Sequence, residues 1–315
     1  MPDLKTQGRA AFVFPGVGVT PSGHEGEFFQ RHREVMRPFL DEAVAFAGDD
    51  LYAILAPRPA AGRPSPRAEE LLELFTYAFD CAVAAVYRQA GLEPSYVAGH
   101  SLGLYAALAV TGAVRFGDGM AMVVRARDFV REACPPGQFG MAVVIGMRAA
   151  EIVSLLGDPA HAGVARANIN NDTATVLSGS VVDLEDFLEV ARREGAFKAV
   201  LLDVDMPYHN PAYLAPATDR FRAFLGGLAW SAPFCPLVSP IDQALLEDPA
   251  ELLECTACNI STPIRWQKVV ERLAALGVAV AVECGPGISL TQHASFIPGA
   301  PKHVNTKTSA WKLRI

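Results

Sequence analysis

A G-x-S-x-G turn between a short apolar run and an alanine-rich stretch constrains this chain more than any other feature. The apolar run covers 96–99, and the motif G-H-S-L-G occupies 99–103. Glycines on both sides of a serine allow a sharp strand-to-helix turn that exposes the hydroxyl above a sheet. The following helix N-terminus offers free N–H groups to a developing negative charge. The motif therefore predicts an α/β fold with Ser101 as a nucleophile; the alternative is a serine that only makes the turn.

Length and composition fit a soluble globular protein with a large core. The chain has 315 residues, of which 51% are hydrophobic and 19% charged. Its net charge of -7 argues against broad nucleic-acid binding. It has no apolar run of the ~18 residues that a membrane span needs, and its first residues lack the apolar core of a signal peptide. We therefore expect a cytoplasmic protein with no membrane contact.

Hydrophobic periodicity divides the chain into two units. Residues 1–137 and 206–315 alternate strands and helices, which predicts one large α/β subdomain with a parallel sheet. Residues 138–205 follow the order β-α-β-β-α-β, which is typical of a ferredoxin-like subdomain. Within the large unit we expect helices at 27–46, 69–89 and 117–132, and a surface loop at 57–66.

A serine nucleophile needs a base, and histidine is the best candidate because its pKa lies near working pH. His209 follows the strand predicted to end at 204, where the small unit rejoins the large one and a cleft should form. His100 adjoins the serine, but its side chain should point away, which favours a structural role. The other five lie in polar or terminal contexts typical of the surface: His24, His32, His161, His293 and His303.

Two backbone N–H groups should stabilise an oxyanion at Ser101. Leu102 supplies one at the start of the helix, and Val17, in the G-V-G loop at 16–18, supplies the second. That loop lacks the further glycine of a dinucleotide-binding turn, so we expect no bound cofactor. The lone C-x-x-C at 255–258 has no second pair at zinc-site spacing, so we expect no metal site.

Several ordered motifs resemble the malonyl-CoA:acyl-carrier-protein acyltransferase family, which includes polyketide-synthase acyltransferases. The resemblance covers nearly the whole chain. Its motifs here are F-V-F-P-G-V-G at 12–18, G-H-S-L-G at 99–103, A-N-I-N at 167–170, V-L-S-G at 176–179, P-Y-H at 207–209, N-I-S-T-P-I-R-W at 259–266 and E-C-G-P-G at 283–287. It implies a hydrolase-like core with an inserted ferredoxin-like subdomain, and it places the catalytic histidine at His209.

The resemblance also implies substrates and partners. The expected reaction forms an acyl-Ser101 ester from an acyl-CoA or an acyl carrier protein, then passes the acyl group to a carrier protein's phosphopantetheine thiol, in polyketide or other secondary-metabolite biosynthesis. The acyl pocket is expected to include Ala126, Met206, Tyr208 and Asn168. The protein is expected to be a monomer. Basic residues for an acidic carrier protein would be Arg192, Arg193, Lys198 and Arg265; the alternative is an ordinary solvated face.

One departure from the family bears on the acyl group. An arginine that pairs with the free carboxylate of malonyl is replaced by Ala126, with Arg125 and Arg127 on either side. Helix neighbours project about 100° apart, so neither should reach the same pocket without a register shift. We therefore predict a less polar pocket and a non-carboxylated acyl group: simple acyl, aminoacyl or peptidyl. The alternatives are an acyl-carrier-protein hydrolase, an ordinary malonyl transferase, and a silent docking module.

Overall fold

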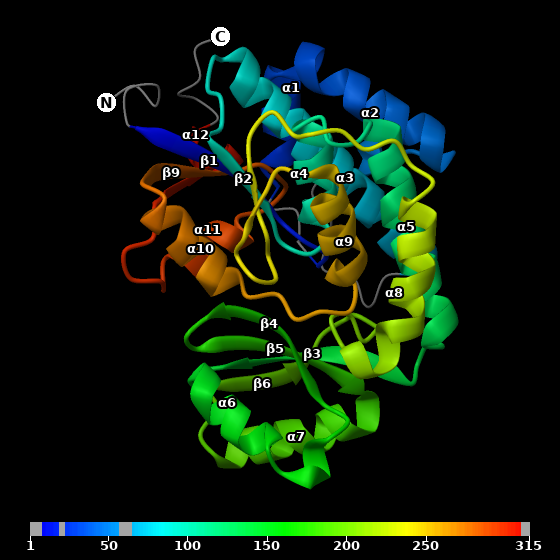
Figure 1. Ribbon diagram of the computed structural model, residues 1–315, viewed down its shortest axis with the longest axis vertical. Helices are drawn as coiled ribbons and strands as arrows, with labels where there is room; N and C mark the ends of the chain where they lie inside the picture. The colour runs from blue at the N-terminus through cyan, green and yellow to red at the C-terminus, as the bar shows by residue number, and fades with distance from the viewer. Residues whose placement is uncertain (1–7, 19–22, 57–64, 310–315) are drawn as a thin grey trace.

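A computed structural model of the chain describes residues 8–18, 23–56 and 65–309. Figure 1 shows a large part built around one sheet and a smaller part built around another. The smaller sheet comes from one continuous stretch of chain, and the large part comes from the segments before and after that stretch. The predicted class, an α/β fold with a parallel sheet and an inserted small unit, is confirmed.

The large sheet places three strand ends at one edge. Its order is β10-β9-β1-β2-β7-β8, and neighbours are parallel except β7 and β8. In β1, Phe14 pairs with Gly99 of β2, while Val13 pairs with Glu283 of β9. Loops that follow these three strands therefore meet beyond their carboxyl ends, where ligands bind in open α/β sheets. The strands are β1 (Arg9–Phe14), β2 (Tyr96–Gly99), β7 (Leu237–Val238), β8 (Leu245–Leu246), β9 (Val278–Glu283) and β10 (Lys302–Asn305).

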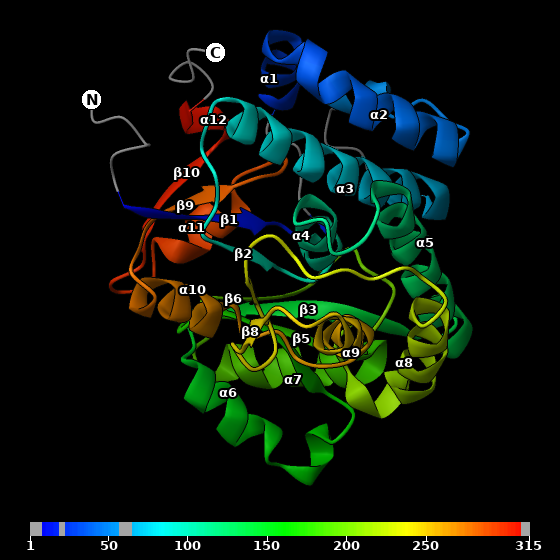
Figure 2. The ribbon, with the colours of Figure 1, turned by 45° about the horizontal axis from the view of Figure 1, so that its top comes forward.

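Helices cover both faces of this sheet, as Figure 2 shows for α3 on one side and α10 on the other. Side chains of β1 alternate between the faces: Phe12 and Phe14 pack toward α3, α4 and α5, and Val13 packs toward α10. The helices are α1 (Glu25–Arg31), α2 (Arg33–Ala47), α3 (Pro66–Gln89), α4 (Gly103–Val110), α5 (Phe116–Ala133), α8 (Pro211–Leu225), α9 (Pro249–Asn259), α10 (Trp266–Ala275), α11 (Ser289–Ala294) and α12 (Thr306–Ser309).

The small sheet has ferredoxin-like topology. Its order, β4-β5-β3-β6, is antiparallel throughout and follows the predicted β-α-β-β-α-β sequence. Helices α6 and α7 pack on one face through Phe187 and its neighbours. The elements are β3 (Phe139–Ile145), α6 (Ala149–Leu156), β4 (Ala165–Asn171), β5 (Ala174–Ser180), α7 (Val181–Arg193) and β6 (Lys198–Leu201). All lie within the predicted range 138–205.

Backbone hydrogen bonds join the two parts beside the strand ends of the large sheet. The N–H of Ile169 in β4 donates to the carbonyl of Ile264 at 2.9 Å, and the N–H of Ile264 donates to Ala167 at 2.8 Å. The loop before α10 thus pairs with β4 as a short extra strand segment. This pairing positions the small sheet across the mouth of the crevice.

Some expected elements differ in detail. The single helix expected at 27–46 is two helices, separated at His32, whose ring packs on Phe28. The loop expected to end at Pro66 ends one residue earlier, because Ser65 caps α3 and proline suits a first helical position; residues 57–64 lie outside the described residues. Of the helices that the structure describes, none is both long and apolar enough to cross a membrane.

Candidate active site

Close backbone packing holds Ser101 in a strained conformation. Its φ is +54°, in the left-handed region that non-glycine residues rarely adopt. Gly103 lies directly against the carbonyl of Phe14, and a side chain there would overlap it. A Cβ on Gly16 would stand 2.7 Å from the His100 carbonyl. The turn can therefore form only with glycine at these positions, and strain of this kind is typical of functional sites.

His209 lies opposite the serine and is also held at a positive φ, +61°. Its Nε2 is 2.9 Å from the Ser101 hydroxyl oxygen. Its Nδ1–H donates to the carbonyl oxygen of Thr262 at 3.1 Å, and its backbone N–H donates to Ile260 at 2.9 Å. Because a carbonyl can only accept, the proton sits on Nδ1, which leaves Nε2 free to accept the serine proton. The arrangement is a nucleophile–base pair oriented by a backbone carbonyl.

The surroundings keep His209 neutral. Burial and the nearby His100 ring lower the pKa of His209 to about 3, against the opposing effect of the bond to the Thr262 carbonyl. A neutral imidazole is the form that can accept a proton, so the resting site is ready for general-base chemistry.

The remaining histidines differ from one another in role. His100 points away from the serine as expected: its Nε2 lies 3.1 Å from the Asn170 side-chain oxygen, and its ring meets the Trp266 indole edge-on. The expectation that five others lie on the surface is wrong for His32 and His161, which are buried against phenylalanine rings. It is also wrong for His293, which lines the cleft beside Ser101; burial there lowers the pKa of His293 to about 4.

The two residues predicted as oxyanion donors both lie beside Ser101. The N–H groups of Val17 and Leu102 have no hydrogen-bond partner among the described residues, and both residues line the hollow that contains Ser101. Asn259 adds a support that the sequence analysis missed, because its side-chain N–H donates to the Ser101 carbonyl at 3.1 Å. Asn259 and Thr262 both fall in the motif at 259–266, which was the available signal for them.

Two hollows meet at the Ser101–His209 pair. A cleft of about 390 Å³ opens between the large and small parts and reaches His293 and the G-V-G loop. An inner pocket of about 20 Å³ continues behind the serine. The inner pocket is lined by Val17, Glu73, Ser101, Leu102, Tyr105, Val123, Ala126, Arg127, Tyr208, His209, Asn259 and Ile260.

The four predicted acyl-pocket residues do not all meet. Ala126 and Tyr208 line the inner pocket. Asn168 lines the outer cleft instead, with a buried side-chain oxygen that has no partner in the described part of the chain. Met206 lines neither hollow, because it is buried in the core beside α3, α4 and α5. Tyr208, two residues further on, lines both hollows, while the Met206 side chain packs into the core.

The arginines beside Ala126 also depart from expectation. Arg125 is 47% exposed and stacks over the Phe129 ring, outside the inner pocket. Arg127 does line that pocket, contrary to the expectation that neither would. Its guanidinium is turned toward the first turns of α3 rather than toward the serine, and its side chain is only 4% exposed. The pocket is thus more polar than predicted.

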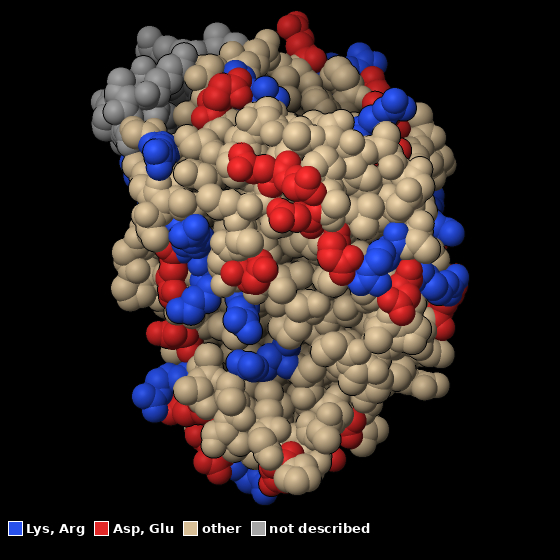
Figure 3. Space-filling view, viewed as in Figure 1, with Lys and Arg blue, Asp and Glu red and all other residues tan. Residues whose placement is uncertain are grey.

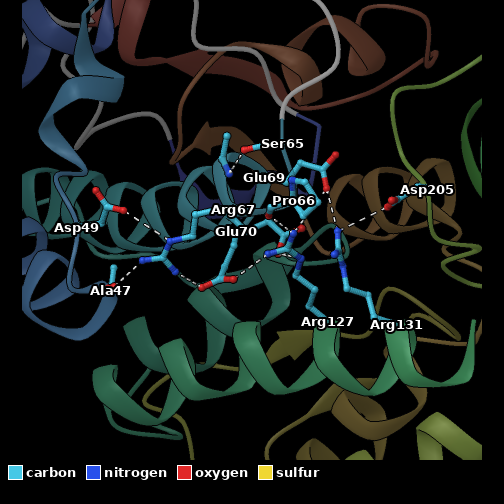
Figure 4. A network of polar contacts seen from close by, with 12 residues as sticks. Ala47, Asp49, Ser65, Pro66, Arg67, Glu69, Glu70, Arg127, Arg131 and Asp205 are labelled. Carbon is cyan, nitrogen blue, oxygen red and sulfur yellow. Dashed lines mark hydrogen bonds and ion pairs between the residues drawn. The ribbon is translucent and has the colours of Figure 1, made fainter. Parts of the chain in front are cut away.

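Figure 4 shows where the Arg127 guanidinium is held. It forms ion pairs with Glu70 at 3.3 Å and Glu69 at 3.5 Å, and it donates to the carbonyl of Pro66. Arg131, one turn further along α5, reaches Glu69 at 3.2 Å and Asp205 at 3.7 Å. These contacts engage both terminal nitrogens of Arg127, Nη1 and Nη2.

In the described part of the chain no group of three potential ligands could hold a metal ion.

Comparisons with known proteins identify the family of this chain. The acyl transferase domain profile matches residues 73–297. The malonyl CoA-acyl carrier protein transacylase of Salmonella typhimurium is 33% identical over 288 residues, 89% of this chain and 90% of that protein. The crystal structure of an acyl-carrier-protein S-malonyltransferase from Burkholderia pseudomallei superposes with a TM-score of 0.87 at 31% identity, covering 98% of this chain and 100% of that one.

A third relative was solved with a partner. It is a malonyl-transacylase in complex with a type II PKS acyl-carrier protein, with a TM-score of 0.84 at 26% identity and coverage of 95% of this chain and 96% of that one. Fold and site together define a serine–histidine acyltransferase. The chain belongs to the acyl transferase domain family, in its malonyl-CoA:acyl-carrier-protein transacylase branch.

Proposed function

We propose that Ser101 and His209 carry out this acyl transfer in two half-reactions. The Ser101 oxygen attacks the carbonyl carbon of a thioester while His209 Nε2 takes the hydroxyl proton, and the N–H groups of Val17 and Leu102 stabilise the oxyanion. Collapse breaks the C–S bond, and His209 returns its proton to the leaving thiolate. A second thiol then attacks the Ser101 ester by the reverse route. Coenzyme A or phosphopantetheine is a substrate here, not a resident cofactor.

The acyl group in this proposal carries no free carboxylate. Two neighbouring positions support this assignment: Ala126 has no charged side chain, and Arg127 is already paired with other groups. Of the described residues lining the two hollows, Arg127 is the single arginine or lysine, and its guanidinium is engaged by Glu69, Glu70 and the Pro66 carbonyl. To bind a malonyl carboxylate in two parallel bonds, it would have to leave these partners.

Ordinary malonyl transfer is the second candidate, and a specific observation favours it. The relatives reported above are named for malonyl transfer, and Arg127 Nε makes no hydrogen bond to a described residue; its ion-pair partner Glu73 lies 3.8 Å away. This nitrogen could meet a carboxylate end-on without the guanidinium leaving Glu69 and Glu70.

An acyl carrier protein is the proposed partner, by analogy with the relative solved in complex with one. Figure 3 shows lysine and arginine side chains gathered over the region that α10 occupies in Figure 1, beside the boundary of the two parts. Arg265, Lys268 and Arg272 of this region are exposed. Arg192 is a weaker candidate, because its guanidinium already donates to the Ala199 carbonyl at 2.7 Å. A polyketide pathway fits the partner of that relative.

Intact mass measurement tests the proposal. The protein is incubated with malonyl-CoA, acetyl-CoA and butyryl-CoA, with Ser101→Ala as the blank, and a fresh carrier protein is then added. An adduct from the neutral donors that moves to the carrier protein supports the proposal. A faster and stable adduct from malonyl-CoA contradicts the non-carboxylated assignment. Loss of the adduct to water, with no transfer to the carrier protein, would instead identify a hydrolase.

A further inference from the structure

A buried carboxylate faces the inner pocket behind the nucleophile. Glu73, in the third turn of α3, lines this pocket together with Ser101 and His209, and its side chain is 6% exposed. Among the described residues it has one ionic partner, Arg127 Nε at 3.8 Å, and no hydrogen bond. A buried carboxylate with one distant partner is costly, so its surroundings should include a group that completes it.

The neighbouring charges do not supply that group. Four carboxylates converge on the two arginines of α5: Glu69, Glu70, Glu73 and Asp205. Arg67 pairs with Glu70 but also with Asp49 at 3.6 Å, so its positive charge is shared between two carboxylates. Glu73 is the one of these four carboxylates that lines the inner pocket, and Arg127 is its one ionic partner among the described residues.

Desolvation favours the neutral form of the Glu73 carboxyl group. Burial raises the pKa of Glu73 to about 7, although Arg127 works in the opposite direction. A cation placed beside the carboxylate would favour the ionised form and replace the lost hydration. A neutral alkyl end offers no such compensation.

The size of the pocket limits what reaches Glu73. A volume of about 20 Å³ corresponds to roughly one water-sized group. The side chains of Tyr105, Val123, Ala126 and Tyr208 form its walls. A terminal ammonium on a short chain matches this space, whereas a long fatty chain or a peptide does not.

We propose that Glu73 binds the ammonium of a short aminoacyl group while its carbonyl is esterified to Ser101. This assignment rests on the acyl transfer proposed above and names its substrate class. The ammonium enters the inner pocket, the thioester carbonyl lies between Ser101 and the Val17 and Leu102 N–H groups, and the thiol occupies the outer cleft. The nitrogen keeps all its bonds and serves only as a recognition group.

Matched donors test this on the unmodified protein. β-Alanyl, butyryl and malonyl pantetheine thioesters have chains of similar length that end in an ammonium, a methyl and a carboxylate. Initial rates of Ser101 acylation are followed by intact mass. We expect β-alanyl to react faster than butyryl by at least about tenfold, the effect of one charged hydrogen bond. Equal rates for β-alanyl and butyryl would overturn the role of Glu73 and leave the proposed function standing. Malonyl as the fastest donor would overturn both.

A variant pair tests the residue itself. Glu73→Gln keeps the shape and removes the charge, and we expect the ratio of the β-alanyl to the butyryl acylation rate to fall to about one. Glu70→Gln is the control, because Glu70 contacts the same arginine outside the pocket. An unchanged preference in Glu73→Gln, or an equal loss in Glu70→Gln, would contradict the proposal. If Glu73→Gln fails to fold, the donor series on the unmodified protein still decides.

Discussion

The nucleophile turn and the inner pocket are adjacent in space but are built in opposite ways. The turn at 99–103 depends on neighbours in sequence and on close backbone contact with β1. The inner pocket depends on side chains from α3 and α5, which lie more than fifty residues apart and meet through ion pairs. In the function proposed above, the first region carries out the reaction and the second selects the acyl group. Catalysis and specificity would then have separate structural origins.

The largest expected effect breaks the catalytic region alone. Ser101→Ala should lower acyl transfer by at least about 10⁴-fold, because both half-reactions pass through the serine ester. The fold should survive, since alanine removes only the hydroxyl that faces His209. Steady-state transfer and circular dichroism measure the two outcomes. Substantial transfer by a folded Ser101→Ala protein would show that another group accepts the acyl chain.

Replacing Arg127, the central cation of the ion cluster, should disrupt the inner-pocket region. Arg127→Met should destabilise the fold by about 3–5 kcal/mol, because it leaves Glu73 buried without its ionic partner and removes one partner each from Glu69 and Glu70. Arg125→Met is the matched control on the same helix, and its effect should stay within about 0.5 kcal/mol because the side chain is half exposed. Urea unfolding compares the two. Equal stability of the two variants would mean that the ion cluster contributes little.

The next largest effect on folding stability is expected from a side chain added to the backbone of the nucleophile turn. Gly103→Ala should cost about 3 kcal/mol, because a methyl group would overlap the Phe14 carbonyl and push α4 away from β1. Gly117→Ala is the control: its added Cβ would have one neighbour, Glu42 Oε1 at 3.7 Å, so alanine should be neutral or stabilising. Thermal unfolding of both proteins checks this. A normal melting temperature for Gly103→Ala would show that the turn relaxes easily.

The same contrast separates the elements that could be predicted from the sequence from those that could not. Strand, turn and helix around Ser101, and the order of elements in the small sheet, follow from periodicity and glycine placement, which are local signals. The positions of β8, β10 and α11 were not predicted, because these short elements depend on pairing with distant strands. Glu73 carried no signal, since a glutamate in a helix is ordinarily exposed. Its burial, and the turning of Arg127 toward α3, arise only when two helices pack.

The smallest expected effect is an absence of change with pH. Burial and His100 lower the pKa of His209 to about 3, well below the ordinary histidine value of about 6.5. The base should therefore stay neutral, and the first acylation step should keep its rate between pH 7 and pH 5 for a neutral donor such as butyryl pantetheine. Single-turnover acylation followed by mass measures this. A fall in rate centred near the ordinary histidine pKa that persists in Glu73→Gln, which lacks the pocket carboxyl with a pKa raised to about 7, would mean that His209 is solvated during the reaction.

The same acidification should affect folding stability through the buried histidines. Above about pH 6.5, His209 is neutral in both the folded and the unfolded chain, so it contributes no pH dependence. Below that value the unfolded chain takes up a proton that the folded protein excludes, which favours unfolding. His293 adds to the trend, since burial lowers its pKa to about 4. The contribution of His293 is measured by comparison: from pH 7 to pH 5 the urea midpoint of the unmodified protein should fall relative to that of His293→Gln. The buried carboxyls Glu73 and Asp80, whose pKa values burial raises and which act in the opposite direction, are the same in both proteins. A constant difference between the two midpoints would contradict this.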